Sequence, residues 1–191
     1  EHGIATTLVR ATSDQLSTAL ARHDIDCLIG RYAAQAQSET FNHQLLFEQR
    51  PALIAHPSLA VRLTKQTPDW RQLAKMDWIL PSPSTPIGTV VTEIFAQAQA
   101  APPVPVVETY SVDVIAAMLR DDPRLISILP EAIARNMVRR GDVGIVGWSL
   151  AWSLPPVNLI RRQRDTPLWA EDMLARILME LTAPLRSVTN E

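Results

Sequence analysis

The chain has 191 residues, of which 47% are hydrophobic and 20% are charged, and its formal net charge at neutral pH is -2. This length can bury one large hydrophobic core or two smaller ones. The nearly neutral charge is unlike the basic surface that nucleic-acid binding requires, so we expect no DNA binding by this chain alone. No apolar run approaches the ~20 residues of a membrane span, and Glu1–Gly3 does not begin a signal peptide. We therefore expect no membrane contact and a cytoplasmic location.

Short apolar runs predict strands along the whole chain, near residues 4–10, 26–30, 44–48, 52–55, 78–80, 104–108, 125–129, 143–146 and 157–161. Amphipathic helices lie between many of them. Thr12, Thr85 and Ser111 are the expected N-caps of three helices, and Gly141 would end a fourth that follows Pro130. The last helix is expected to begin at Thr166–Pro167 and to pack through an apolar face with i, i+4 spacing, made of Trp169, Met173, Ile177 and Leu181.

Hydroxyl side chains stand at three places where a predicted strand opens into a helix. They are Thr12 with Ser13, the loop Ser82–Thr85, and Thr109–Ser111. A capped helix start presents free backbone N–H groups and the positive end of a helix dipole, which suit a small anion. Each terminus contributes only ~0.3 to 1 kcal/mol, so several must converge, as they do at the carboxyl ends of strands in open α/β sheets. The pattern predicts a sensor for a small ligand.

The elements of residues 4–31 and 104–130 follow the same order of strand, capped helix and strand. The second copy is preceded by its own strand and helix at 78–100, whereas the first copy begins without them. Alternating strands and helices favour parallel sheets. We therefore expect an α/β fold with two doubly wound lobes, the first of them N-terminally incomplete. Residues 1–79 plus 162–191 would form the first lobe and 80–161 the second, joined by a hinge near 77–81 and 158–162.

Six short motifs resemble, in order and spacing, the effector-binding domain of LysR-type transcriptional regulators. The resemblance covers about Ile4 to Ala183, and one departure is Ser58, inserted into the family's usual His-Pro-Leu-Ala as an expected change in a surface loop. A looser likeness is to the branch that controls aromatic-acid and sugar catabolism. The motifs are Asp26–Arg31, His56–Ala60, Asp77–Pro81, Thr85–Pro86, Val107–Thr109 and Ile128–Pro130.

This resemblance implies a fold similar to type 2 periplasmic solute-binding proteins, with a small-molecule inducer in the hinge cleft. It also implies a homodimer or homotetramer, and DNA binding only through a helix-turn-helix domain upstream of Glu1. The family binds its inducer at strand ends, where Arg31 could meet a carboxylate or pair with a surface acid such as Asp14. For the hydroxyls, helix capping is the alternative role. The candidate ligand-binding residues are Thr12, Ser13, Arg31, Ser82, Ser84, Thr85 and Pro130.

Two other classes of function can be weighed against a regulator. Gly147–Ala151 differs by one residue from the nucleophile elbow of hydrolases, but every histidine precedes Ser149, whereas a hydrolase histidine follows its serine. No histidine or cysteine pair has metal-ligand spacing, so we expect no enzyme, no metal and no cofactor. A solute-binding receptor of a transport system would share the fold but needs export, so the sequence upstream of Glu1 would distinguish it.

Overall fold

The structure is a computed structural model that describes residues 3–31, 40–150, 152–164, 166 and 168–187. It divides into two compact units, which we call the first unit (Glu1–Glu48 with Pro155–Glu191) and the second unit (Gln49–Leu154). Within the described ranges, no helix is both long enough and apolar enough to cross a membrane.

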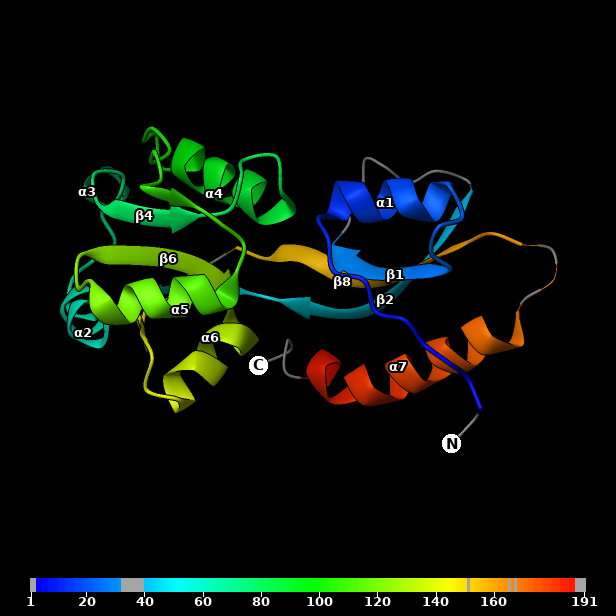
Figure 1. Cartoon of the computed structure of the whole chain (residues 1–191). Coiled ribbons are helices and arrows are strands. Elements are labelled where there is room, and N and C mark those ends of the chain that lie inside the picture. The colour runs from blue at the N-terminus through cyan, green and yellow to red at the C-terminus, as the bar shows by residue number, and fades with distance from the viewer. Residues whose placement is uncertain (1–2, 32–39, 151, 165, 167, 188–191) are drawn as a thin grey trace. The chain divides into compact units, whose positions relative to one another are not determined.

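The first unit is built on a three-stranded sheet with the order β1-β8-β2, covered by a helix on each face (Figure 1). β1 and β8 are antiparallel, with Cys27 opposite Arg161. Successive side chains of a strand point to opposite faces, so Leu28 and Ile160 pack with Leu20 of α1, while Leu159 of β8 lies in the cluster that includes α7. The elements are α1 (Ser13–Ala21), β1 (Cys27–Arg31), β2 (Phe41–Gln49), β8 (Leu154–Arg162) and α7 (Trp169–Ser187).

The second unit is built on a mixed five-stranded sheet with the order β5-β4-β6-β3-β7. β4 is parallel to β5 and to β6, whereas β3 is antiparallel to β6 and β7. The strands are β3 (Pro51–Ala55), β4 (Asp77–Leu80), β5 (Val107–Glu108), β6 (Leu125–Pro130) and β7 (Gly144–Ile145). The helices are α2 (Pro57–Thr64), α3 (Trp70–Leu73), α4 (Pro86–Gln97), α5 (Val112–Asp121) and α6 (Glu131–Arg139).

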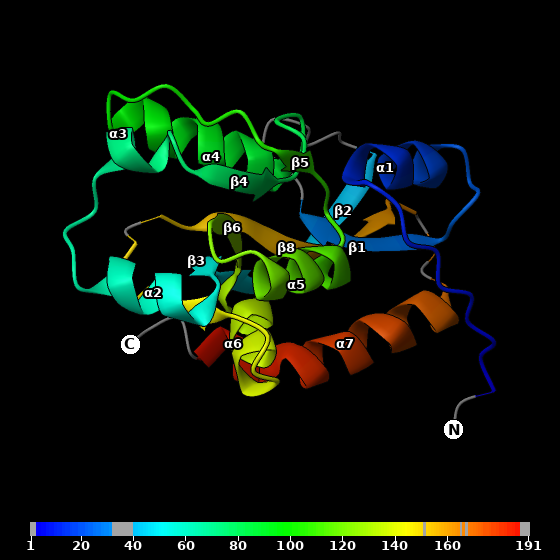
Figure 2. The ribbon, with the colours of Figure 1, turned by 60° about the vertical axis from the view of Figure 1, so that its left-hand side comes forward.

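Helices cover both faces of this sheet, with α4 and α5 on opposite sides in Figures 1 and 2. On one face, Trp78 packs with Phe95 of α4 and with residues of α2 and α3. On the other face, Ile79 packs with Leu119 of α5 and Met137 of α6. The central strand β6 is buried along its whole length, which explains its continuous apolar sequence.

Eight of the nine expected strands are present, but the expectation of a strand at residues 4–10 is wrong. This segment has no strand conformation, and its Leu8 is 90% exposed. A strand is stable only when its backbone pairs with a neighbour, and in the described part of the chain no strand pairs with residues 4–10.

The two units begin and end at other residues than the expected lobes. The chain passes between units after Glu48 and after Leu154, instead of near residues 79 and 161. The reason is the antiparallel ladder of β3 with β6, from Pro51 opposite Pro130 to Ala55 opposite Ile126. This ladder holds residues 51–55, and the helices that follow them, in the second unit. It also makes the sheet mixed, where alternating elements favoured a parallel one.

The C-terminal helix α7 packs in the first unit, as expected, but through another face. Trp169 and Leu181 are 61% and 69% exposed, whereas Ala175 and Glu171 are buried and Glu171 forms an ion pair of 3.2 Å with Arg164. Apolar residues lie around most of this helix, so their spacing could not select the buried side. Pro167, expected in the first turn, lies outside the described residues.

The helices α2 and α3 were not expected from the sequence. Ser58 lies inside α2 rather than in a loop, and the Nδ1 atom of His56 lies 2.8 Å from the Ser58 hydroxyl at the N-terminal end of this helix. Asp69 caps α3 by accepting hydrogen bonds from the backbone N–H groups of Arg71 and Gln72. Both helices are short, so they offer little periodicity to detect.

His43 in β2 is expected to make the stability of the chain sensitive to mild acid. Burial lowers the pKa of His43 from its ordinary value of 6.5. Below about pH 6.5 the unfolded chain binds a proton that the folded chain does not, so the free energy of unfolding should fall as the pH drops towards the folded pKa. Urea titrations at several pH values would measure this fall, and His43→Gln should reduce it. An unchanged pH dependence in that variant would contradict the assignment.

Candidate functional site

Three parallel strands of the second unit end at one edge of the sheet. Leu80, the last residue of β4, lies opposite Glu108 of β5, and Ile79 lies opposite Ser127 of β6. The helices α4, α5 and α6 each follow one of these strands, so their N-termini converge at this edge (Figure 1). We call it the carboxyl edge. Three helix termini therefore meet at this edge, and the charges in their first turns decide which of them can attract an anion.

The loop Ser82–Thr85 is folded back onto the start of α4. The Thr85 hydroxyl accepts a hydrogen bond of 3.1 Å from the Gly88 N–H and donates one of 2.7 Å to the Ser82 carbonyl. The hydroxyls of Ser82 and Ser84 are 3.1 Å apart. A Cβ atom on Gly88 would lie 2.1 Å from the Ser82 carbonyl oxygen, so only glycine permits this close approach. Three of the candidate residues thus form one hydrogen-bonded loop.

The three helix N-termini differ in charge. Asp113 lies in the first turn of α5 and Glu131 in the first turn of α6, whereas the first turn of α4 has no acidic residue. An acid in the first turn offsets the positive end of the helix dipole. The exposed carboxylate of Glu108 also stands at the end of β5. The start of α4 is therefore the part of the carboxyl edge best suited to an external anion.

Pro130 lies at the carboxyl edge, where β6 joins α6. It is buried, ends β6 and occupies the N-cap position of α6 without a side-chain hydrogen bond. Thr109 and Ser111 complete the edge. The Thr109 hydroxyl accepts from the Ser111 N–H at 3.1 Å, and the Ser111 hydroxyl accepts from Val114 N–H at 3.5 Å. The sequence pattern identified these hydroxyls and put Glu108 at the end of a predicted strand, but Gly88 gave no signal that could have placed it here.

The remaining candidates belong to the first unit. Thr12 is the N-cap of α1, and its N–H donates to the Gln15 side chain at 3.2 Å. Ser13 is the first residue of α1, and both residues are partly exposed. Arg31 ends β1, and its guanidinium donates to the Pro155 carbonyl of β8 at 2.5 Å. Burial lowers the pKa of Arg31 to about 10, so the side chain stays charged at neutral pH.

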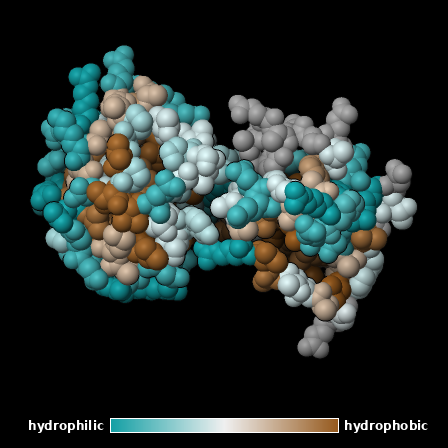
Figure 3. Space-filling view, turned by 45° about the horizontal axis from the view of Figure 1, so that its top comes forward, coloured by the Kyte–Doolittle hydropathy of each residue, from teal (hydrophilic) through white to brown (hydrophobic). Residues whose placement is uncertain are grey.

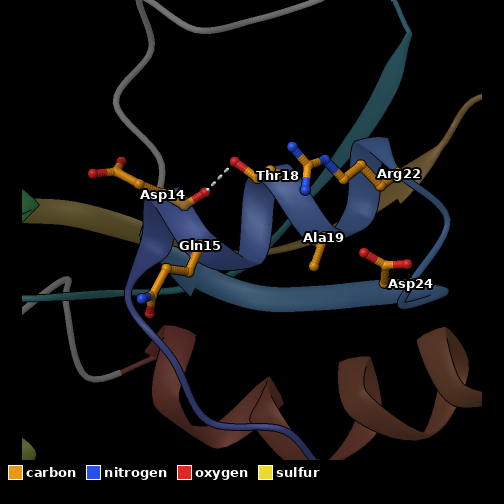
Figure 4. A pocket seen from close by; sticks show the side chains of 6 residues that line it. All are labelled: Asp14, Gln15, Thr18, Ala19, Arg22 and Asp24. Carbon is orange, nitrogen blue, oxygen red and sulfur yellow. Dashed lines mark hydrogen bonds between the residues drawn. The ribbon is translucent and has the colours of Figure 1, made fainter.

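A shallow hollow runs along the exposed side of α1 (Figure 4). Asp14 and Asp24 contribute carboxylates to it and Arg22 contributes one guanidinium, while the Thr18 hydroxyl is used in a bond of 2.9 Å to the Asp14 carbonyl. Neither Thr12 nor Ser13 lines this hollow. Its two carboxylates make it a poor site for an anion.

The segment that resembled a nucleophile elbow is held against α2. The Gly147 N–H donates to the Thr64 hydroxyl at 2.8 Å, and the Trp148 indole donates to the Gln66 carbonyl at 2.9 Å. A nucleophile elbow joins a strand to a helix, but residues 147–150 and 152–153 are not helical, and Ala151 lies outside the described residues. Within the described ranges, no three His, Cys, Asp or Glu residues form a group that could hold a metal ion.

The fold of this chain is similar to the folds of several solved structures. The regulatory domain of HypT from Salmonella typhimurium superposes with a TM-score of 0.72 at 15% identity, over 97% of this chain and 86% of that chain. DarR from Vibrio fischeri, solved in complex with DNA, superposes with a TM-score of 0.67 at 17% identity, over 91% of this chain and 56% of that chain. The BenM effector-binding domain with benzoate superposes with a TM-score of 0.67 at 19% identity, over 91% of this chain and 76% of that chain. The fold is thus that of type 2 periplasmic binding proteins.

The chain belongs to the LysR substrate-binding domain family, whose pattern matches residues 2–181. No curated protein matched the sequence. Membership confirms the expected fold class and a ligand-sensing regulatory domain, in a family of regulators rather than enzymes, and does not favour a transport receptor. The aromatic-acid branch and the individual site residues stay predictions.

Proposed function

We propose that this chain senses a small organic anion at the start of α4 on the carboxyl edge. The observation that carries the proposal is the first turn of α4, which lacks an acid and is overlaid by three hydroxyls of the loop Ser82–Thr85. Two structures similar to this chain hold anions: BenM is described with its effector benzoate and HypT with a bromide ion.

Thr12, Ser13 and Arg31, the candidates that belong to the first unit, stay proposed effector-binding residues. Thr12 and Ser13 would donate hydrogen bonds, and Arg31, which is charged at neutral pH, would bind a carboxylate bidentately. A ligand shifts a conformational equilibrium only by its differential affinity for the two states, and reversing a 1:99 population needs ~5.5 kcal/mol. Neutral hydrogen bonds contribute ~0.5 to 1.5 kcal/mol and charged ones ~1.5 to 3, so three or four contacts are required.

The parent protein would be a cytoplasmic LysR-type regulator. DNA binding would come from a domain outside this chain, and the active form would be a homodimer or homotetramer with closed symmetry. DarR and HypT are described as LysR-type regulators, DarR in complex with DNA. Support for this part comes from family membership and not from the charge of this chain.

Thr12→Ala and Thr85→Ala are each expected to weaken effector binding about tenfold, which corresponds to ~1.4 kcal/mol. Thr12→Ala removes one hydroxyl contact to the anion, and Thr85→Ala removes the hydrogen bonds that hold the loop Ser82–Thr85 on the start of α4. A thermal-shift panel of benzoate, other aromatic acids, sugar acids and amino acids would first identify a ligand. Calorimetric titration of the parent and the variants would then give the affinities. Loss of a cap can also lower the free energy of unfolding by ~1 kcal/mol, so binding must be measured on folded protein.

Thr92→Ala provides the matched control for this test. Thr92 lies on α4 two turns from the loop, and its hydroxyl donates to the Gly88 carbonyl at 3.1 Å. We expect this variant to bind like the parent. If Thr12→Ala and Thr85→Ala also bind like the parent, their hydroxyls serve only as helix caps and the proposed site is wrong.

A further inference from the structure

The second unit has a groove at the opposite end of β4 from the carboxyl edge. Its volume is about 600 Å³, and it lies between the segment that follows α3 and the segment that leads into β5. Met76 and Asp77 contribute the start of β4, and Val104 and Val106 contribute the facing wall. None of the candidate effector residues lines it.

Apolar side chains form the wall of this groove and are held there by the backbone. Val104 is 86% exposed and Val106 is 54% exposed. The Val106 N–H donates to the Trp78 carbonyl at 2.9 Å, and Pro103 is buried. The segment is therefore fixed on the sheet while two branched apolar side chains remain in contact with water. Apolar residues also reach the surface elsewhere in both units (Figure 3), so the apolar wall alone does not define a site.

Prolines exclude one kind of occupant. Pro102, Pro103 and Pro105 lie in the segment that leads into the edge strand β5. Proline has no N–H group, so this segment lacks three of the donors that an added strand would need. An extended peptide pairing with the sheet is thus disfavoured here, whereas a small ligand needs no such ladder.

Two cations give the groove its charge preference. Arg71 and Lys75 line it and are exposed. Among the residues that the structure describes, neither side chain forms a hydrogen bond or ion pair. Asp77 is the one acid of the lining. Two unpaired cations beside an apolar wall complement a molecule with an anionic head and an apolar body.

We infer that this groove binds an amphipathic organic anion, an aryl or alkyl carboxylate or sulfonate, at a site separate from the carboxyl edge. The apolar body lies against Met76, Val104 and Val106, and the anionic group lies between Arg71 and Lys75. The floor is rigid because the Trp78 indole donates to the Leu73 carbonyl at 2.7 Å and the Met76 N–H donates to the same carbonyl at 3.0 Å. This inference does not depend on the identity of the effector.

The test uses 8-anilinonaphthalene-1-sulfonate, a fluorescent aryl sulfonate, with the intact folded chain. Binding would be followed by the emission of the dye under excitation of tryptophan, since the Trp78 carbonyl accepts a hydrogen bond from Val106 of the groove wall. The double variant Arg71→Gln/Lys75→Gln is expected to raise the dissociation constant at least tenfold. Val104→Asp, which removes apolar wall and adds a negative charge, should have a similar effect. Octanoate should displace the dye, and acetate should not.

The matched control is Arg62→Gln/Lys65→Gln, which removes the same charge from exposed residues of the same unit that do not line the groove. We expect this control to bind the dye within twofold of the parent. An equal loss in both double variants would show a non-specific charge effect and overturn the inference, and so would an unchanged affinity in Arg71→Gln/Lys75→Gln. Loss of dye binding in Thr85→Ala alone would place the dye at the carboxyl edge instead. If the groove does not bind the dye, the effector titrations of the Thr12 and Thr85 variants still test the proposed function independently.

Discussion

Replacing Trp78 by alanine is expected to lower the free energy of unfolding by about 3 to 5 kcal/mol. Trp78 is 1% exposed and belongs to the core cluster that joins β4, β6 and α4. Its ring meets Phe95 edge-on, with centroids 5.7 Å apart and an interplanar angle of 80°. Its indole N–H donates to the Leu73 carbonyl at 2.7 Å. Alanine would leave a cavity and a buried carbonyl without this donor.

Trp169→Ala is the matched control for that substitution, because Trp169 is 61% exposed on α7. We expect Trp169→Ala to change the free energy of unfolding by no more than about 0.5 kcal/mol. Urea unfolding followed by far-ultraviolet circular dichroism avoids the tryptophan signal that both variants lose. The free energy of unfolding of Trp78→Phe should lie between those of the parent and the alanine variant, since phenylalanine retains the ring packing and loses the hydrogen bond. Equal losses for Trp78→Ala and Trp169→Ala would contradict the assigned core.

Gly88→Ala is expected to reduce effector binding by more than tenfold, the largest effect of any single methyl group at the carboxyl edge. The new Cβ would lie 2.1 Å from the Ser82 carbonyl oxygen and 2.8 Å from the Pro83 Cα, and both are backbone atoms. The loop Ser82–Thr85 must therefore move. The cap between the Thr85 hydroxyl and the residue 88 N–H, 3.1 Å in the parent, would lengthen with it.

The stability effect of Gly88→Ala is expected to be smaller than its binding effect. Crowding costs about 1 to 3 kcal/mol, but alanine favours a helix over glycine by about 1 kcal/mol, which offsets part of that cost. Calorimetric titration with the identified effector measures the loss of binding, and urea unfolding measures the change in stability. Parent-like binding in a stable Gly88→Ala variant would show that the loop does not form the site. Thr92→Ala on the same helix again serves as the control.

Local patterns predicted most helix ends correctly, because each depends on a few neighbouring residues. Thr85 and Ser111 cap α4 and α5 as expected, and Gly141 follows α6 with a φ of +78°, a conformation that glycine adopts without strain. The six spaced motifs likewise indicated the family that the chain belongs to. These inferences needed only the order and type of residues along the chain.

Strand pairing could not be predicted from local patterns of residues. Residues 4–10 and 52–55 are both short segments in which apolar residues predominate. Only residues 51–55 find partners, on both sides of β3, and they join the second unit rather than the first. The choice of partner depends on residues far away in the sequence, such as Pro130 opposite Pro51. Similarly, the buried face of α7 depends on which residues the sheet of the first unit presents to it.

The sequence by itself determined the family, the capped helices and the hydroxyl loops that make an anion the expected ligand, since these follow from short-range chemistry. Only the tertiary structure decided where those loops meet. The parallel register of β4, β5 and β6 brings three helix N-termini to one edge, and the acids of α5 and α6 leave the start of α4 as the favoured place for negative charge. Electrostatic preference depends on distances in space, which the order of residues along a chain does not contain.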